Sequence, residues 1–536
     1  MSQAEEVKQP RRALELLAVA VVLAAAAFLR GANLRWGLPN AQHYFSYHPD
    51  EIFLLLPSFG FAAGDWNPGF FNYGTLYIYL VGIPALLLGL VPGRASFPEH
   101  LAPLYLLART ITMVLGVATV LLLYLALRRR GRFTAWLSAL LLALCPLHLV
   151  TSAYATVDVP STFWITLAFL LALRAADQPS PKSGALVGLA VGLAAATKYN
   201  AGLFLVPALL APVIVSPRAW RQGYAASVLG GAALGFIIGC PFFWTREFLR
   251  DFLFEVQHAR VGGTLAFVDT GNGWWYHLSR GLPFALGYPL LAAFLLGLIA
   301  ALRRPTRAST LALFSIFLYL LVIGFSKERF IRYLVPITPF LCLVSAQGLA
   351  LLPRLSRRRW PKAIAVTLAC ALIAASFACA FTMDLVRGIR DPRDSAMAAL
   401  EERARRPGVL RVGLVAAPWF CHPPVSPYNA GPFSRRFFSE WNRERGDPVA
   451  ITGWDAQSLR DQRPDVFFLS DLESMDRIRL RDPDAVAFVE ALDSIYKQRT
   501  SFSQSPPIRL APHPAWAPPD WRYESPRIIM YESPRP

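Results

Sequence analysis

Tyr47-His48-Pro49-Asp50-Glu51 follows closely on the first long apolar run of the chain, which extends from Leu16 to Leu29. Ionisable residues beside a membrane span are costly to place, and they usually serve a function. A helix N-terminus needs one capping acid, whereas this stretch carries two in succession. We therefore interpret His48, Asp50 and Glu51 as parts of a reactive site, and the apolar segments around them as the scaffold that holds this site.

The composition is that of a membrane protein that crosses the bilayer several times. Of the 536 residues, 54% are hydrophobic and only 16% are charged, against roughly 25% charged residues in soluble proteins. The mean hydropathy is +0.39. In a soluble chain the net charge of +18 would suggest a nucleic-acid partner. Here the basic residues cluster between apolar runs, as in cytoplasmic loops, so no nucleic acid is expected.

Apolar segments long enough to cross a bilayer predict a mainly α-helical fold with about eleven transmembrane helices, because a helical span needs about 20 apolar residues. The segment 74–92 would break the alternation of sides if it crossed once, so we expect a re-entrant or interfacial helix there, or a span with an unrecognised partner. The predicted spans are 13–33, 104–127, 133–152, 160–177, 183–197, 199–216, 223–241, 281–302, 309–325, 333–352 and 361–382.

Lys and Arg residues predict the orientation, because they are enriched in cytoplasmic loops. The basic N-terminus and five loops are assigned to the cytoplasm. These loops contain Arg128–Arg132, Arg174 with Lys182, Arg218 with Arg221, Arg303 and Arg304 with Arg307, and Arg354 with Arg357–Arg359. The remaining connections then lie outside. They are 34–103, 153–159, 241–280, 326–332 and everything after 382.

Two further candidates lie at the predicted outer ends of spans. Asp158 precedes Pro160 at the start of one span, so it is either a helix cap or a functional acid. Lys198 separates two short spans. Its side chain either extends to the lipid headgroups or binds a phosphate.

The turn Lys327-Glu328-Arg329-Phe330-Ile331-Arg332-Tyr333 has three basic residues on the predicted outer side, where positive charge is normally depleted. Such a cluster suits a phosphate held at the membrane surface; the alternative is that this loop is cytoplasmic. The long outer loop adds Glu255, His258 and Arg260. Its aromatic residues Trp274–Tyr276 fit an interfacial belt better than sugar stacking.

Other kinds of site lack a pattern in the sequence. His258 and His277 have no second ligand at helical spacing, so no metal site is predicted. The phosphate-binding glycine motifs of nucleotide sites do not occur, and no cofactor is expected. The six cysteines show no pairing pattern, so no disulfide framework is expected.

These groups predict group transfer from a lipid-linked phosphate. A departing phosphate needs cations, and an acceptor hydroxyl needs a base. A carboxylate whose pKa is raised by partial burial can act as that base. A transporter or flippase of a lipid-linked sugar is the alternative, although paired halves with helices broken at mid-membrane, which are typical of transporters, are not evident.

Five motifs in order resemble a known family. They are HPDE at 48–51, NPGFFNYGTLYIYL at 67–80, YATVDVPSTFW at 154–164, ATKYNAGLFLVP at 196–207 and RYLVPITPFL at 332–341. Together they resemble polyprenyl-phosphate-sugar-dependent glycosyltransferases of the GT-C fold. The resemblance covers about residues 13–382 and is closest to glycosyltransferase family 39, the protein O-mannosyltransferase-like group and the lipid A aminoarabinose transferases.

The resemblance implies a catalytic Asp in the first outer loop, matching Asp50, completed by Glu51, and a second acid, matching Asp158. It implies an inverting transfer from a polyprenyl-phosphate sugar to an extracytoplasmic glycan, lipid or protein, in a bacterial inner membrane. Where the family has a Lys or a His-Pro-Pro in its first loop, this chain has Asn72-Tyr73-Gly74. The residues that would face the lipid phosphate are Lys327, Arg329, Arg332 and Tyr333.

The composition becomes polar and proline-rich after Asp384. We therefore expect a membrane domain over 1–383 and a small extracytoplasmic α/β domain over 384–536, which either recognises the acceptor or caps the site. Apolar spacing predicts one helix, Ala485–Gln498, and the proline-rich segments 512–514 and 518–519 are expected to be loops. The predicted strands are Val409–Ala417, Val449–Thr452, Asp465–Ser470 and Arg527–Tyr531.

Overall fold

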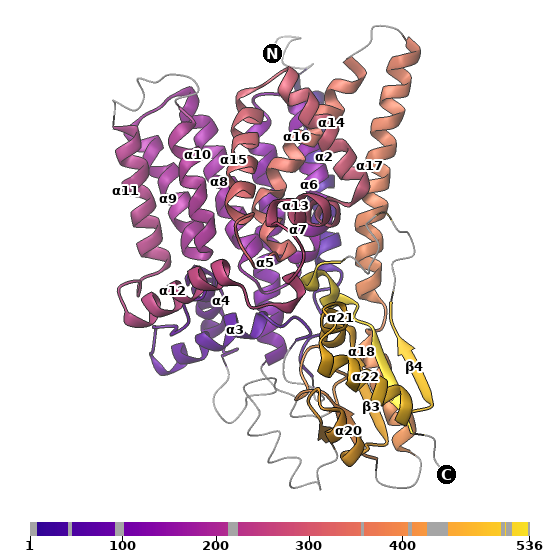
Figure 1. Cartoon of the computed structure of the whole chain (residues 1–536). Coiled ribbons are helices and arrows are strands. Elements are labelled where there is room, and N and C mark those ends of the chain that lie inside the picture. The colour runs from indigo at the N-terminus through magenta and orange to yellow at the C-terminus, as the bar shows by residue number, and fades with distance from the viewer. Residues whose placement is uncertain are drawn as a thin grey trace.

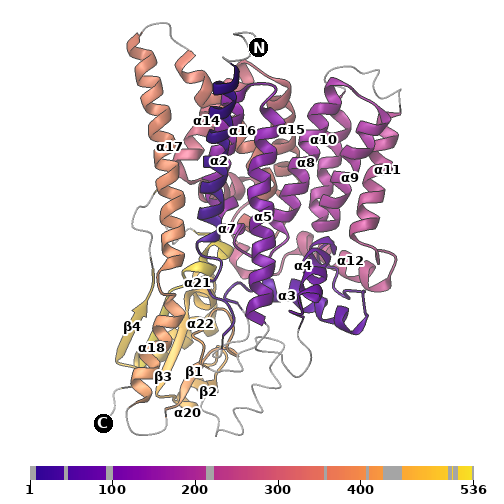
Figure 2. The ribbon, with the colours of Figure 1, turned by 180° about the vertical axis from the view of Figure 1, so that it is seen from behind.

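The structure is a computed structural model, and it describes residues 8–40, 46–91, 101–212, 223–354, 359–405, 410–425, 449–504, 510 and 517–533. It consists of a bundle of helices with a small β-sheet at one end, the end away from the N-terminus (Figure 1, Figure 2). The predicted basic loop with Arg218 and Arg221 and the proline-rich segment 512–514 lie outside the described residues.

Within the described residues, six helical segments are long and apolar enough to cross a membrane. Shorter apolar helices stand beside them, so the predicted membrane-spanning helical scaffold is confirmed, whereas the number of eleven spans is not. The six long segments contain α2 (Lys8–Gly31), α5 (Leu101–Leu127), α8 (Asp158–Asp177), α13 (Gly273–Tyr276) with η5 (His277–Gly281) and α14 (Leu282–Arg303), η6 (Ile331–Ile337) with α16 (Thr338–Leu351) and η7 (Leu352–Arg354), and α17 (Arg359–Gly388). The shorter helices of the bundle are α6 (Arg132–Ala143), α7 (Pro146–Thr151), α9 (Pro181–Thr197), η2 (Tyr199–Phe204), α10 (Leu205–Leu210), α11 (Tyr224–Gly239) and α15 (Arg307–Ile323).

Helices α9 and α11 pack backbone against backbone through glycines spaced four residues apart. A Cβ atom added at Gly188 would lie 2.0 Å from the carbonyl oxygen of Val228, and one at Gly192 would lie 2.1 Å from that of Ala232. Lipid offers no hydrophobic drive for two apolar helices to associate, so close van der Waals contact must hold them together. Small residues in this pattern permit that contact.

Gly188→Ala is therefore expected to lower the free energy of unfolding by about 1–3 kcal/mol, because the added methyl group overpacks the α9–α11 interface. Gly230→Ala is the matched control. A Cβ atom at Gly230 meets no atom within 4 Å, and Ala is the better helix former by about 1 kcal/mol. Denaturant unfolding in detergent would measure both, and equal effects of the two substitutions would contradict this packing.

Short elements gather at the end of the bundle that carries the sheet (Figure 1). Helix α4 has only 12 residues and is about 18 Å long, too short for a hydrocarbon core of about 30 Å. This length fits the re-entrant or interfacial helix expected within 74–92. The short elements are α3 (Glu51–Leu55), η1 (Leu56–Ala63), α4 (Leu76–Leu87), α12 (Arg246–Val261) and η4 (Leu265–Phe267).

The sheet has five strands in the order β2-β1-β3-β5-β4. Strand β1 runs parallel to β2 and β3, and β5 runs antiparallel to β3 and β4. Sequence patterns predicted four of these strands but not β4, an exposed edge strand of sequence QRTSF that lacks apolar alternation. The strands are β1 (Val412–Leu414), β2 (Val449–Ile451), β3 (Val466–Ser470), β4 (Gln498–Phe502) and β5 (Ile528–Glu532). The helices around the sheet are α18 (Pro392–Ala404), α20 (Ala456–Gln462), α21 (Asp471–Arg479), α22 (Pro483–Ile495) and η10 (Pro519–Glu524).

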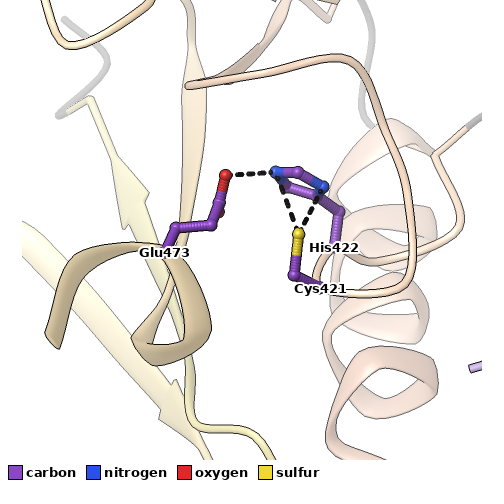
Figure 3. A group of neighbouring side chains, drawn as sticks. All are labelled: Cys421, His422 and Glu473. Atoms are coloured by element: carbon purple, nitrogen blue, oxygen red, sulfur yellow. Dashed lines mark hydrogen bonds and ion pairs between the residues drawn. The ribbon is translucent and has the colours of Figure 1, made fainter. Parts of the chain in front are cut away.

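A hydrogen-bonded cluster ties the loop after β1 to helix α21 (Figure 3). The amide of Trp419 donates to Nδ1 of His422, at 3.2 Å, and Nε2 of His422 lies 3.0 Å from Oε1 of Glu473. The thiol of Cys421 lies 3.3 Å from Nδ1. Cys, His and Glu are common zinc ligands, but these contacts occupy both imidazole nitrogens, so we assign the cluster a packing role.

Candidate functional site

The acidic turn and the basic turn predicted from the sequence meet at the end of the bundle that carries the sheet. A guanidinium nitrogen of Arg332, in η6, lies 3.1 Å from Oδ2 of Asp50, which directly precedes α3. Both side chains keep some exposure, 12% for Arg332 and 25% for Asp50. A carboxylate and a cation thus share one partly open place, although they are far apart in the chain.

Glu51, the neighbour of Asp50, is fully buried and occupied by protein groups. Arg109 of α5 binds it in a two-pronged geometry, with Nε 2.8 Å from Oε1 and Nη2 2.7 Å from Oε2. The amide of Ala155 and the hydroxyl of Ser46 donate to the same carboxylate. The oxygens of Glu51 already accept bonds that hold the turn in place, and this geometry suits a role in orienting Asp50.

The acid Asp158 forms an ion pair with Lys198, whose Nζ lies 2.6 Å from Oδ1 of Asp158. Both side chains are buried. Asp158 begins α8 without a capping contact from its side chain, so it is not a helix cap. The ammonium of Lys198 binds Asp158 and does not extend to the headgroups. The ammonium also lies 5.1 Å from the centre of the Tyr333 ring, which brings Lys198 and Tyr333 to one place.

His48 lies beneath the acidic turn as a packed ring. It stacks on Tyr154 at 4.4 Å and meets Tyr523 edge-on at 5.4 Å, between ring centres. Its Nδ1 accepts from the amide of Asp50. Burial lowers the pKa of His48, so the ring is neutral near pH 7. This contact helps to position Asp50. Because His48 also lines the small cavity of the site, its part in binding a substrate stays a prediction.

The other predicted cations turn away from Asp50, because a turn projects successive side chains in different directions. Arg329 contacts the hydroxyl of Thr270 and the ring of Tyr276, and Lys327 is exposed. On α12, Arg260 is exposed and His258 lies 3.5 Å from the buried Glu328. The structure therefore does not place the side chains of Lys327, Arg329, Arg260 and His258 beside Asp50.

Glu255 and Asn72, two residues noted in the sequence, complete the surroundings. Glu255 of α12 accepts a 2.8 Å hydrogen bond from Nδ2 of Asn72, in the first outer loop. Burial raises the pKa of Glu255, while the charges of Lys198 and Arg332 act in the opposite direction. Asn72, at the point where the chain departs from the family pattern, thus holds a carboxylate next to the charged groups.

The C-terminal region contributes a buried acid, Asp520 of η10. Its two carboxylate oxygens accept from the amides of Ile331, at 3.1 Å, and Arg332, at 3.0 Å. Burial raises the pKa of Asp520. This carboxylate therefore fixes the backbone that carries Arg332. Sequence reasoning read this segment as a loop, and only its Pro-Pro-Asp-Trp composition could have drawn attention to it.

A small cavity remains between these groups. Its volume is about 20 Å³, enough for a single water molecule, which needs about 10–15 Å³. This cavity is too small to hold a sugar or a phosphate. The charged residues that line the cavity are Asp158, Arg332 and Asp520.

Comparison with known proteins agrees with this architecture. The profile of the dolichyl-phosphate-mannose-protein mannosyltransferase family matches residues 106–244, and that of the Alg9-like mannosyltransferase family matches residues 270–419. An undecaprenyl phosphate-alpha-4-amino-4-deoxy-L-arabinose arabinosyl transferase of Pseudomonas aeruginosa is 30% identical over 243 residues, 43% of this chain and 42% of the relative. A second strain's enzyme is 29% identical over 320 residues, 57% and 56% of the two chains. The chain thus spans about half the length of the curated relatives it matches.

Solved structures show the same fold. ArnT from Cupriavidus metallidurans bound to undecaprenyl phosphate has a TM-score of 0.51 at 14% identity, over 97% of this chain and 99% of the other. The Archaeoglobus fulgidus oligosaccharyltransferase has a TM-score of 0.51 at 13% identity, over 92% and 73%. The fold is that of the membrane-bound GT-C glycosyltransferases. The chain is a homologue of the ArnT aminoarabinose transferases, so the resemblance seen in the sequence is confirmed.

Glu51→Gln is expected to lower the free energy of unfolding by about 3–5 kcal/mol, because it leaves Arg109 buried without its counter-charge. Asp493→Asn removes an exposed ion pair with Arg499 and should change it by less than about 1 kcal/mol. Chemical denaturation of the purified variants would measure both. A Glu51→Gln protein as stable as the wild type would contradict the stabilising role that we assign to the Glu51–Arg109 contact.

Proposed function

We propose that this protein transfers a sugar from a polyprenyl-phosphate carrier to an acceptor on the extracytoplasmic face of a bacterial inner membrane. The contact between Asp50 and Arg332 carries the proposal, because it places a base beside a cation that can bind phosphate. The relatives support the carrier, since the Pseudomonas aeruginosa enzyme is named for undecaprenyl phosphate and the Cupriavidus metallidurans structure is bound to it. The sugar is a hexose or a pentose, and the acceptor is a glycan, a lipid or a protein.

The reaction is a single displacement at the anomeric carbon of the donor. The acceptor oxygen forms a bond to this carbon while the bond from the carbon to the phosphate oxygen breaks. The acceptor proton passes to the carboxylate of Asp50, and the bonding electron pair leaves with the polyprenyl phosphate. Because attack and departure take place on opposite faces of the sugar, the anomeric configuration inverts. Arg332 stabilises the negative charge that develops on the departing phosphate.

The ion pair of Asp50 with Arg332 implies an order of events. In this structure the charge of each group neutralises the charge of the other. A phosphate that enters competes for the guanidinium, which binds phosphate well because its fork of N–H donors matches the phosphate oxygens. Asp50 then loses its partner and becomes free to accept a proton. The donor thereby activates the base, and the acceptor binds second.

Asp158 and Lys198 form a second pair of a carboxylate and a cation, and both side chains are buried. Lys198 lies beside the ring of Tyr333, next in sequence to Arg332. In this proposal Lys198 binds the same phosphate from the other side, and Asp158 holds the ammonium ready until the donor arrives. Burial makes this exchange of partners costly unless the incoming phosphate supplies equal charge.

Asp50→Asn is expected to lower the rate of sugar transfer by about 10²–10⁴-fold, because general-base catalysis contributes that much, while the protein still folds. Asp65→Asn, an exposed acid in the same outer segment, is the matched control and should retain full activity. Membrane vesicles supplied with labelled polyprenyl-phosphate hexose or pentose would report the label that enters the envelope fraction.

Movement of the labelled lipid between leaflets should be followed in the same vesicles. Full transfer by the Asp50→Asn protein would refute the assignment of the base. Lipid movement without any sugar transfer by the wild type would favour a flippase instead of a transferase.

Asp520→Asn is expected to raise the KM for the donor about tenfold with little change in the KM for the acceptor. An amide can accept only one of the two backbone bonds that Asp520 holds, and a lost bond of this strength corresponds to about a tenfold effect. Steady-state kinetics with each substrate varied in turn would separate the two constants. Equal changes in both KM values would indicate general loosening of the fold rather than the positioning of Arg332.

A further inference from the structure

A second hollow, lined by charged and apolar residues, lies at the ends of α5, α8, α14 and α16. These helix ends are at the end of the bundle opposite to the sheet (Figure 1). Its volume is about 620 Å³, within the range of about 300–1,000 Å³ that is typical of ligand sites. The connection between α5 and α6, the end of α8, the turn between α14 and α15, and the last part of α16 with η7 form its walls. The residues that line this basin include Arg129, Arg130, Asp177, Arg304, Arg307 and Arg354.

The charge of this arginine basin is unbalanced. Five arginines and one aspartate line it, so their formal charges leave a surplus of four. Asp177 is already shared by Arg130, at 2.7 Å, and Arg307, at 3.2 Å. For Arg129, Arg304 and Arg354, the described part of the chain offers no carboxylate within ion-pair distance. Three guanidinium groups are thus free to bind an anion.

The walls combine this cationic rim with apolar side chains. Leu343, Ala350 and Leu351 line the α16 side, and Gln347 holds the opposite wall through a 3.3 Å hydrogen bond from Nε2 to the carbonyl oxygen of Arg304. A guanidinium fork suits phosphate oxygens. The apolar side suits the glycerol and first methylene groups of a lipid, and the volume exceeds that of a single inorganic phosphate.

The ordinary explanation for arginines at this end is the rule that basic residues determine orientation. That rule requires charge near the ends of spans but not a concave arrangement. Lys182 and Arg303 satisfy it at the same end, exposed and outside the lining of the basin. Five arginines from three separate segments that converge on one hollow indicate a binding site in addition to a topological signal.

We propose that the arginine basin binds a phosphate-bearing anion of the size of a lipid headgroup, on the side of the membrane opposite to Asp50. Basic pockets between membrane helices bind anionic headgroups in this way. Such an anion would join the ends of α5, α14 and α16 by a common counter-charge. It would stabilise the bundle at a distance from the site of transfer, and it does not depend on the proposed reaction.

The test compares two double variants of the full-length protein in nanodiscs. Arg304→Gln with Arg354→Gln removes two unpaired cations of the basin. Lys182→Gln with Arg303→Gln removes the same charge from the same end outside the basin. The unfolding temperature and the lipids retained in native mass spectrometry are measured with added cardiolipin, phosphatidylglycerol or phosphatidylcholine, and with inorganic pyrophosphate in place of lipid.

We expect cardiolipin and phosphatidylglycerol, but not phosphatidylcholine, to raise the unfolding temperature of the wild type and of the control. The basin variant should bind them about thirtyfold more weakly while unfolding like the wild type in phosphatidylcholine, which shows that it folds. A shift with pyrophosphate alone would identify a soluble anion as the ligand of the same basin. Equal losses in both double variants, or equal effects of all lipids, would overturn the proposal.

Discussion

The bond between Glu51 and Arg109 is the contact on which the site depends. It joins the acidic turn to the middle of the bundle, since Arg109 belongs to the long helix α5 and also donates to the carbonyl oxygens of Leu34 and Trp36. Two buried charges are costly to bring together unless every hydrogen bond is satisfied. Here both oxygens of Glu51 are satisfied, so the turn has one stable position. Asp50 is placed toward Arg332 as a result.

The balance of positive and negative charge differs between the two ends of the bundle. At one end, acids and cations occur in matched pairs, Asp50 with Arg332 and Asp158 with Lys198. At the other end, arginines exceed acids. Matched pairs can exchange partners with an incoming phosphate, whereas an excess of one sign attracts a permanent counter-ion. The two ends are therefore suited to turnover and to anchoring, respectively.

Sequence reasoning predicted the helical scaffold and several residues of the site because charge beside an apolar run is conspicuous. Asp50, Asp158, Lys198 and Arg332 all stand out in this way, and the structure brings them to one end. Arg109 was missed because a single Arg inside a long apolar run gives no pattern. The sequence did not reveal that Arg329 contacts Tyr276 and that Lys327 is exposed, because a turn sends neighbouring side chains to different sides and spacing alone does not determine which.

Asp520 was missed for another reason, which is that its partners are backbone amides. A carboxylate that binds N–H groups in a distant turn leaves no mark in the composition of either segment. The role of Asn72 toward Glu255 was hidden in the same way, since the sequence showed only a departure from a family pattern. Tertiary contacts of this kind depend on how the outer loops fold over the bundle.

The contact of Asp520 with the turn of Arg332 also bears on how such proteins can diverge. Because the C-terminal region holds the backbone of Arg332 through Asp520, it is not an independent module that can be exchanged freely. A chimera that receives its outer region from a relative would have to keep η10, or an equivalent acid, to retain a working centre. Variation in acceptor preference is therefore expected to accumulate on the outer surfaces of α20, α22 and β4, away from the contact between Asp520 and the turn of Arg332.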